Sequence, residues 1–396
     1  MYNFNVVVVV DVYNEHGGAS SAAMRCGREY SKLFRNSYII CNSVVKGEAI
    51  PKDVFVINNE KDLFGFLIEK RIDVIHYFKA QKSLVHFSIF NRIVHYKRKY
   101  NIKVVTTVCQ QPSYPSVILT PFEIRYSDHL VFIDKTAFSD SLYNFIPIEN
   151  KSWMYLLPPW NANNPLNKFE KRDYSCKKKV LFGRGSTLEK CPKDVIDIYD
   201  KINITQEKEF YIVGVPDGNN WLRNKIIGRR DIHSCPIQNM EKWAEIAQTF
   251  DICIYYLPSN IYSSIDGALG TVLRNGVPTI VYGPPAPKER IIHGVNGFIA
   301  NTKDEIIKYA ELLARDENLR RKIGQSARKH IIDDSPKEYW VDKHARIIND
   351  LCIGNISCVK IKIPFTRSIH LTLIKAYGLV NTLCNKIYGK LIYAKL

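Results

Sequence analysis

Residues 4–11 read FNVVVVVD, and Gly17-Gly18 follow before a helical pattern that runs to about Phe34. An unbroken valine run is typical of a parallel strand buried on both faces. Glycines between a strand and a helix let the backbone approach a ligand, and the helix N-terminus favours negative charge. A plain tight turn explains them equally well. The G-x-G-x-x-G dinucleotide fingerprint is absent, which disfavours a dehydrogenase.

The alternation of strands and helices continues outward from this unit. Strands are expected at 37–41, 54–58, 73–78, 103–108 and 129–134, with helices at 61–71 and 83–97. A Pro/Asn-rich break at 157–165 ends this half, and the pattern then restarts. The second half predicts strands at 178–182, 209–213, 251–257 and 279–282, and helices at 193–201, 239–249, 266–274, 303–315, 318–329 and 337–352.

This order predicts an α/β protein with two parallel-sheet domains and a cleft between them. The expected boundaries are 1–160 for the first domain, 161–335 for the second, 336–352 for a closing helix and 353–396 for a basic tail. Ligands in such sheets bind beyond the carboxyl ends of the strands.

The composition is that of a globular protein, with 396 residues, 46% hydrophobic and 24% charged. No apolar run reaches the roughly 18 residues of a membrane-spanning helix, and no signal peptide is evident. The ten cysteines form no C-x-x-C pair. We expect reduced thiols, no metal site and a cytoplasmic location, although a disulfide framework is the alternative.

The charge predicts an anionic partner. Lys and Arg number 56 against 39 acids, giving a net charge of +17, and residues 351–396 contain no acid. Nucleic acid, anionic lipid and a phosphorylated substrate all fit this balance. In the tail, apolar residues recur at helical spacing between lysines: Ile369, Leu373, Ala376, Val380, Leu383, Ile387 and Leu391.

Two interpretations of residues 368–396 remain open. One is a helix lying on an anionic membrane, which would place the protein on the cytoplasmic face of that membrane. The other is a helix packed back on the protein body with its lysines in solvent. Nucleic-acid binding is disfavoured because the sequence contains no recognisable nucleic-acid module.

Cations occur at the first loop–helix junction of the second half. Arg184 lies between two glycines directly after the predicted strand, and Lys190 comes six residues later. Two cations at such a junction suit a diphosphate. Two solvated loop cations are the alternative.

A second junction opens the helix at 266–274. Asp266 is a natural N-cap before Gly267, Ala268 and Leu269. Free N–H groups at a helix start suit phosphate oxygens. A capped helix without any ligand is again the alternative.

Taken in order, these segments resemble glycosyltransferase family 4, a group 1 family of GT-B retaining nucleotide-sugar transferases. Residues 275–280 (NGVPTI) and 287–299 (PKERIIHGVNGFI) carry the most specific resemblance. Residues 180–184 with Lys190, 210–214 and 240–259 also fit, as do Gly17-Gly18 and 73–76 in the first half. The resemblance covers roughly residues 5–345.

The resemblance implies a GT-B fold of two Rossmann-like domains facing a cleft. The second domain would bind the nucleotide sugar and the first the acceptor. Arg184 and Lys190 would stabilise the leaving diphosphate, so no metal and no cofactor beyond the donor is expected.

Further contacts follow from the same resemblance. Gly17 and Gly18 would face the diphosphate, joined by N–H groups at Gly267, Ala268 and Leu269. Asp266 would contact the sugar and Thr271 the ribose. Glu289, expected at a helix start, would cap that helix or touch the donor.

Two positions depart from the family pattern. The family has two Glu residues spaced as E-x7-E, and here Ser263 and Thr271 occupy those positions when counted back from Gly276. Counted forward from Ser259, the positions hold Tyr262 and Gly270. Cys109 stands near the place of a family His. His76, at the end of a strand, is interpreted as a structural histidine.

Two function classes follow. The first is a retaining glycosyltransferase acting on a glycan or lipid-linked acceptor. The second is a protein of the same fold that binds a nucleotide sugar or a partner without catalysis, which the missing carboxylates favour.

Overall fold

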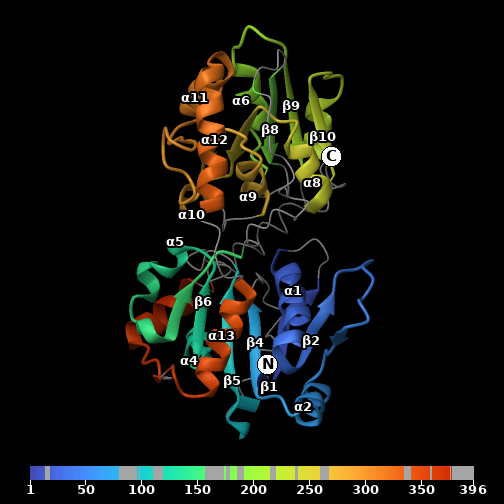
Figure 1. The fold of residues 1–396 in the computed structure, drawn as a ribbon, viewed down its shortest axis with the longest axis vertical. Coiled ribbons are helices and arrows are strands. Elements are labelled where there is room, and N and C mark those ends of the chain that lie inside the picture. Colours follow the sequence, from blue (N-terminus) through green and yellow to red (C-terminus); the bar gives the residue numbers. More distant parts are fainter. Residues whose placement is uncertain are drawn as a thin grey trace. The chain divides into compact units, whose positions relative to one another are not determined.

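The computed structural model describes most of the chain. The described residues are 1–13, 18–79, 96–97, 99–109, 119–156, 174, 179–184, 191–214, 220–236, 240–258, 267–333, 340–356, 359–374 and 376. The chain divides into two compact units (Figure 1). Unit 1 comprises Met1–Leu156 with Glu338–Leu396, and unit 2 comprises Leu157–Lys337.

Unit 1 contains a seven-stranded sheet in the order β3-β2-β1-β4-β5-β6-β7. All of its strand pairs are parallel. Its elements are β1 (Tyr2–Tyr13), α1 (Gly18–Leu33), β2 (Phe34–Val44), β3 (Val54–Val56), α2 (Glu60–Glu69), β4 (Val74–Lys79), β5 (Lys103–Val108), α4 (Pro121–Tyr126), β6 (His129–Phe132), α5 (Lys135–Phe138), two 3₁₀ turns (Ser141–Tyr143, Ile148–Asn150), β7 (Lys151–Trp153) and α13 (Trp340–Cys352).

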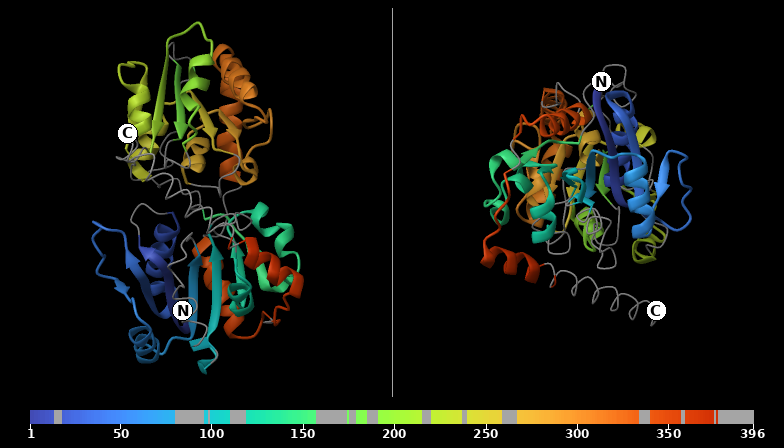
Figure 2. Two further views of the ribbon diagram at one scale, coloured as in Figure 1. Left: turned by 180° about the vertical axis from the view of Figure 1, so that it is seen from behind. Right: turned by 90° about the horizontal axis from the view of Figure 1, so that it is seen from below.

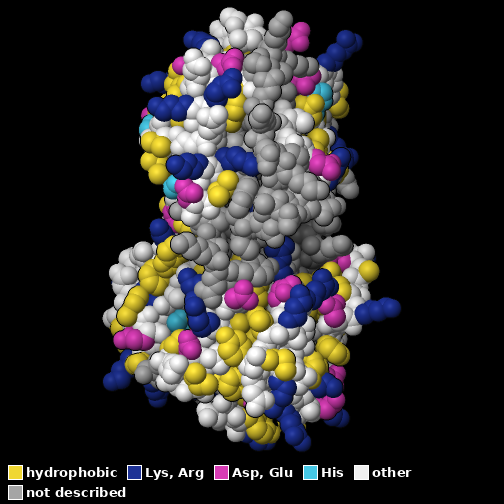
Figure 3. Space-filling view, in the orientation of Figure 1, with side chains coloured by type: hydrophobic (Ala, Val, Ile, Leu, Met, Phe, Trp, Pro, Cys, Tyr) yellow, Lys and Arg dark blue, Asp and Glu magenta, His cyan; other side chains and the backbone are white. Residues whose placement is uncertain are grey.

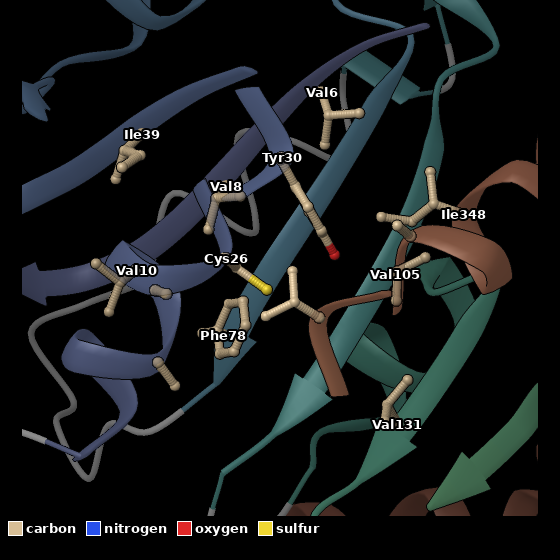
Figure 4. Packing of buried hydrophobic residues seen from close by; sticks show 14 of the residues in the cluster. Val6, Val8, Val10, Cys26, Tyr30, Ile39, Phe78, Val105, Val131 and Ile348 are labelled. Carbon is tan, nitrogen blue, oxygen red and sulfur yellow. The ribbon is translucent and has the colours of Figure 1, made fainter. Parts of the chain in front are cut away.

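The valine run explains why β1 lies inside this sheet. Val6, Val8 and Val10 join a core on one face, with side chains from α1 and α13 (Figure 4). Val7 and Val9 join a separate core on the other face, with α2. Successive strand residues point to opposite faces, so an all-valine strand is buried on both. The predicted two-sided burial is confirmed.

Helix α13 completes unit 1 although it follows unit 2 in the sequence. Trp340, Ile348 and Leu351 are buried in the same core as the even-numbered valines of β1. After α13, residues 365–374 form a helix at the edge of unit 1, drawn in red in Figure 2. The described part of the basic segment thus belongs to unit 1.

Unit 2 contains a six-stranded parallel sheet in the order β10-β9-β8-β11-β12-β13. Its elements are β8 (Lys179–Arg184), α6 (Val195–Lys201), β9 (Lys208–Val213), α7 (Asn220–Ile226), β10 (Ile232–Cys235), α8 (Met240–Ala247), β11 (Ile252–Tyr256), α9 (Gly267–Arg274), β12 (Thr279–Tyr282), α10 (Pro285–Lys288), β13 (Phe298–Ile299), α11 (Lys303–Arg315) and α12 (Glu317–Asp333). Each unit has the strand order 3-2-1-4-5-6 of a Rossmann sheet, extended by one strand in unit 1.

The expected α/β class and parallel sheets are confirmed, while several short elements are additions to the sequence prediction. Strands β7, β10 and β13 have three, four and two residues. Segments this short show no periodicity against their flanking loops. The predicted helix at 83–97 lies almost entirely outside the described residues.

The surface shows no large field of one sign in the view of Figure 3. Lys and Arg side chains are scattered over the visible face with acidic side chains between them. Among the described residues, no helix is both long and apolar enough to span a bilayer. Every cysteine in the described part of the chain is a free thiol.

Candidate functional site

The candidate site of unit 2 lies where the strand order reverses, between β8 and β11. These strands pair in parallel, with Ile252 opposite Leu181 and Ile254 opposite Gly183. Arg184 is the last residue of β8. In open α/β sheets, ligands bind beyond the carboxyl ends of the strands at such a reversal. The topology therefore puts the predicted diphosphate-binding Arg184 at the ligand-binding edge of its sheet, although its side chain lies outside the description.

Helix α9 opens from the other strand of this pair. It begins at Gly267, after β11 and a loop, so Gly267, Ala268 and Leu269 form its first turn. Two predicted contact sites, the end of β8 and the start of α9, thus flank the same strand reversal. Lys190, Asp266 and Gly17 lie outside the described residues.

Thr271, which one of the two expected registers places at the family's second Glu, is 5% exposed. Its hydroxyl donates a hydrogen bond of 2.8 Å to the carbonyl of Gly267. With its proton engaged, the oxygen retains only acceptor capacity toward a ribose hydroxyl. A neutral hydroxyl oxygen accepts more weakly than a charged carboxylate, so a ribose contact of Thr271 would be weaker than that of a Glu.

A brace links the ligand-binding edge of the unit 2 sheet to helix starts. The Tyr256 hydroxyl, at the end of β11, donates to Asp194 Oδ1 at 2.7 Å. Lys303, the first residue of α11, forms an ion pair with the same carboxylate. Asp194 directly precedes α6. The brace fixes the chain shortly after the loop that contains Lys190, and sequence reasoning missed it because its members are distant in the sequence.

Two buried arginines lie in the same unit. Arg274 ends α9, Arg290 follows α10, and both side chains are almost fully buried. Burial first, and then the charge of Arg290, lowers the pKa of Arg274 to about 10. The sequence signal was a lone Arg in an otherwise apolar helix, and it passed unnoticed.

The expected position of Glu289 at a helix start is wrong. Helix α10 begins at Pro285, and Glu289 is its C-cap residue, with its N–H bonded to carbonyls of the same turn. The physical reason is Pro284-Pro285, which fixes the helix start four residues earlier than expected. A capping role at the N-terminus is thereby excluded, and contact with the donor stays a prediction.

The most family-like segments prove to be architectural. Gly276 has a φ of +65°, and a Cβ there would lie 2.9 Å from Tyr174 Oη and 3.2 Å from the Gly324 carbonyl. Only glycine permits α9 and α12 to approach this closely at that φ. The NGVPTI segment therefore closes α9 and directs the chain into β12.

The second family-like segment builds the turn before β13. Asn296 is buried; its Oδ1 accepts from the Ile292 N–H at 2.7 Å, and its Nδ2 donates to the Arg290 carbonyl at 3.1 Å. Gly294 has a φ of +74° and donates its N–H to the Gly297 carbonyl. This segment thus positions β13 at the edge of the unit 2 sheet.

In unit 1, Gly18 is the first residue of α1, which follows β1 at the strand reversal of this sheet. An added Cβ at Gly18 would meet no atom within 4 Å. Packing within the unit therefore does not require glycine at this position, which is compatible with a role in ligand approach.

His76 is a structural histidine, as predicted. It is fully buried, and its Nδ1 and Nε2 lie 3.0 Å from Tyr30 Oη and 2.8 Å from Thr107 Oγ1. Thr107 also bonds His344 Nε2 at 2.9 Å, and His344 Nδ1 lies 2.8 Å from the Trp340 carbonyl. Burial first, and then the charge of the His344 imidazole, lowers the pKa of His76 well below its usual value.

The Trp340 carbonyl fixes the direction of this relay, because it can only accept. His344 Nδ1 must donate, so its Nε2 accepts from Thr107; the Thr107 oxygen then accepts from His76 Nε2, and His76 Nδ1 accepts from Tyr30. These directions hold for neutral imidazoles, the form that burial favours by lowering the pKa of both histidines. The sequence signal for His344 was its place among apolar residues on one face of α13.

Cys109 is buried at the end of β5, and its Sγ lies 3.8 Å from the Thr107 carbonyl. Burial raises the pKa of this thiol far above its usual value. A buried neutral thiol is a poor substitute for an imidazole donor. Among the described residues, no group of three or more His, Cys, Asp or Glu side chains is placed to hold a metal ion.

Comparison with known proteins identifies the fold and gives a family match over part of the chain. A glycosyltransferase from Rickettsia africae ESF-5 superposes with a TM-score of 0.64 at 14% identity, covering 89% of this chain and 99% of its own. Anabaena HepE in complex with UDP gives 0.65 at 12% identity, with coverages of 88% and 100%. A Listeria monocytogenes protein assigned as a UDP-N-acetylglucosamine 2-epimerase gives 0.57 at 10%, with coverages of 92% and 100%.

No curated protein sequence gave a match. Identities this low show the fold alone, and a fold by itself does not determine an activity. The sequence profile described as "Glycosyl transferases group 1" matches residues 164–330. This span covers most of unit 2, including the end of β8 and all of α9. Residues 164–330 are therefore similar to group 1 glycosyltransferases, within a chain that has the two-unit GT-B fold.

Proposed function

We propose that this chain is a glycosyltransferase that moves a sugar from a nucleoside-diphosphate donor to a glycan or lipid-linked acceptor. The single observation that carries the proposal is the group 1 match over unit 2, where Arg184 and α9 flank the strand reversal. Unit 1 would bind the acceptor. Because HepE is described in complex with UDP, a UDP-sugar is the first donor to test.

In the proposed reaction, negative charge develops on the diphosphate as it leaves. Arg184 and Lys190 would stabilise that charge, with the N–H groups of the first turn of α9. Asp266 would contact the sugar, and Gly17 and Gly18 would let the backbone of unit 1 approach the diphosphate. Two cations would supply the charge that a metal gives elsewhere, so we propose metal-independent transfer. Retention of the anomeric configuration is proposed from the family resemblance alone.

One observation favours a second candidate, a nucleotide-sugar-binding protein without turnover. Thr271 stands where a carboxylate is expected, and its hydroxyl proton is already bonded to Gly267. Such a protein would bind the donor and never release the nucleoside diphosphate.

Release of UDP from UDP-sugars, measured with glycan and lipid-linked acceptors, tests the proposal. Arg184→Ala/Lys190→Ala should lower the rate roughly a hundredfold or more, as loss of transition-state charge stabilisation does. Lys193→Ala/Lys201→Ala is the matched control, because it removes two exposed cations from the same unit. Equal rates in both double variants would contradict the assigned roles.

Two further measurements on the same reaction test metal independence and retention of configuration. A chelator should leave the rate unchanged, and proton NMR should show the donor's anomeric configuration in the product. Binding without any UDP release across the acceptors would favour the non-catalytic protein.

A further inference from the structure

The described part of the basic segment, residues 359–376, is anchored to unit 1 by one side. Ile361 and Leu371 are buried in a core with Phe132 and Tyr143. Asn150 Nδ2 donates to the Val359 carbonyl at 3.1 Å. The helix at 365–374 therefore has a fixed inward face.

The opposite face of this helix is apolar as well. Phe365, Ile369 and Leu373 are 79%, 44% and 63% exposed. At 100° per residue, positions four apart drift by only 40°, so these three side chains form one stripe. Leu371 lies about 160° away from the leading edge of that stripe at Leu373 and 120° from Phe365 in the other direction. A surface helix ordinarily exposes polar residues, so an exposed apolar stripe indicates a surface that binds a partner.

This geometry separates the two interpretations of the basic segment over its described part. The helix packs on unit 1 through Leu371, but this packing leaves Ile369 and Leu373 of the predicted apolar series exposed. The apolar series that continues in the sequence as Val380, Leu383, Ile387 and Leu391 starts with the exposed pair.

Charge identifies the partner's chemistry. Lys360 and Lys362 are exposed in the segment that leads into this helix. Residues 351–396 contain seven Lys and Arg and no acid. We propose that this helix docks on an anionic lipid bilayer, with Phe365, Ile369 and Leu373 inserted at the interface and the lysines against lipid phosphates. The inference does not depend on the sugar-transfer proposal.

Co-sedimentation of the full chain with lipid vesicles tests this docking. The wild-type protein should bind phosphatidylcholine vesicles containing phosphatidylglycerol, bind pure phosphatidylcholine much less, and lose affinity at high salt. Phe365→Ser/Ile369→Ser/Leu373→Ser should weaken binding about tenfold or more. Lys360→Gln/Lys362→Gln should weaken binding roughly fivefold per lysine, and only to the anionic vesicles.

A matched control removes three exposed apolar side chains elsewhere: Phe55→Ser/Ile148→Ser/Ile227→Ser. It should bind as the wild-type protein does, and unchanged thermal unfolding of the triple variants would show that each is folded. Equal vesicle binding by the stripe variant and the wild type would overturn the proposal. Concentration-dependent dimerisation through the stripe, without vesicle binding, would also overturn it and identify a second copy as the partner.

Discussion

At the scale of single residues, the Tyr30–His76–Thr107–His344 relay is the most exacting feature of unit 1. All four side chains are fully buried. Each bond has one permitted direction, so removing a central member leaves two buried ring nitrogens without partners. A lost partner costs about 1–3 kcal/mol per buried polar group.

Thr107→Val should therefore lower the free energy of unfolding by about 2–5 kcal/mol, measured by urea denaturation. Thr106→Val is the neighbouring control. Thr106 Oγ1 lies 2.7 Å from Ser127 Oγ, and Ser127 still donates to the Glu123 carbonyl without it. The control should cost about 1 kcal/mol. Similar losses for the two variants would argue against the relay.

The role of a single residue was predictable from the sequence where the local sequence alone determines that role. His76 lies within the buried strand β4 and not at its end as expected, and an apolar strand of this kind made its structural role predictable. Its partner His344 lies 268 positions further along; nothing in local sequence pairs them. The expected position of Glu289 at a helix start was wrong because Pro284 and Pro285 place the start of α10 earlier in the sequence.

At the scale of elements, amino-acid composition predicts the long helices and strands but not the short ones. The β1 valines allow only a strand buried on both faces. Strand β10 reads IHSC and gains its strand conformation from pairing with β9, which is tertiary information. Of the candidate site, the sequence placed Arg184 and Gly267 at the correct edge, because strand ends and helix starts follow from alternation alone.

The close contact of α9 and α12 gives a prediction at this scale. Gly276→Ala should destabilise the protein by more than the roughly 1–2 kcal/mol of a left-handed backbone, because the new Cβ also meets Tyr174 and Gly324. Gly294→Ala is the control. It has a φ of +74° and open space around its Cβ, so it should show the backbone cost alone. Thermal unfolding would compare the two, and equal losses would deny that α12 constrains the NGVPTI segment.

At the scale of the whole molecule, acid should weaken unit 1 more than unit 2. Burial first lowers the pKa of His129 and of His344 from 6.5 to about 4, and none of the described histidines of unit 2 is buried. A depressed histidine pKa means that the unfolded chain binds more protons, so the stability is present above pH 6.5 and is lost as the pH falls toward 4.

Hydrogen exchange of β5 amides, compared with those of β11, measures this effect. The free energy of opening of β5 should fall by up to about 3 kcal/mol per histidine between these pH values. A flat profile for β5 would mean that these histidines are not held neutral by the fold.

We propose that unit 2 binds the diphosphate of a nucleotide sugar through Arg184 and Lys190. Thermal unfolding with a panel of nucleoside-diphosphate sugars tests it most directly, since a ligand of the folded state raises the midpoint by mass action. We expect one donor to raise the midpoint of thermal unfolding of the wild type and of Lys193→Ala/Lys201→Ala, but not that of Arg184→Ala/Lys190→Ala. A donor that stabilises all three proteins alike, or no stabilising donor, would contradict it.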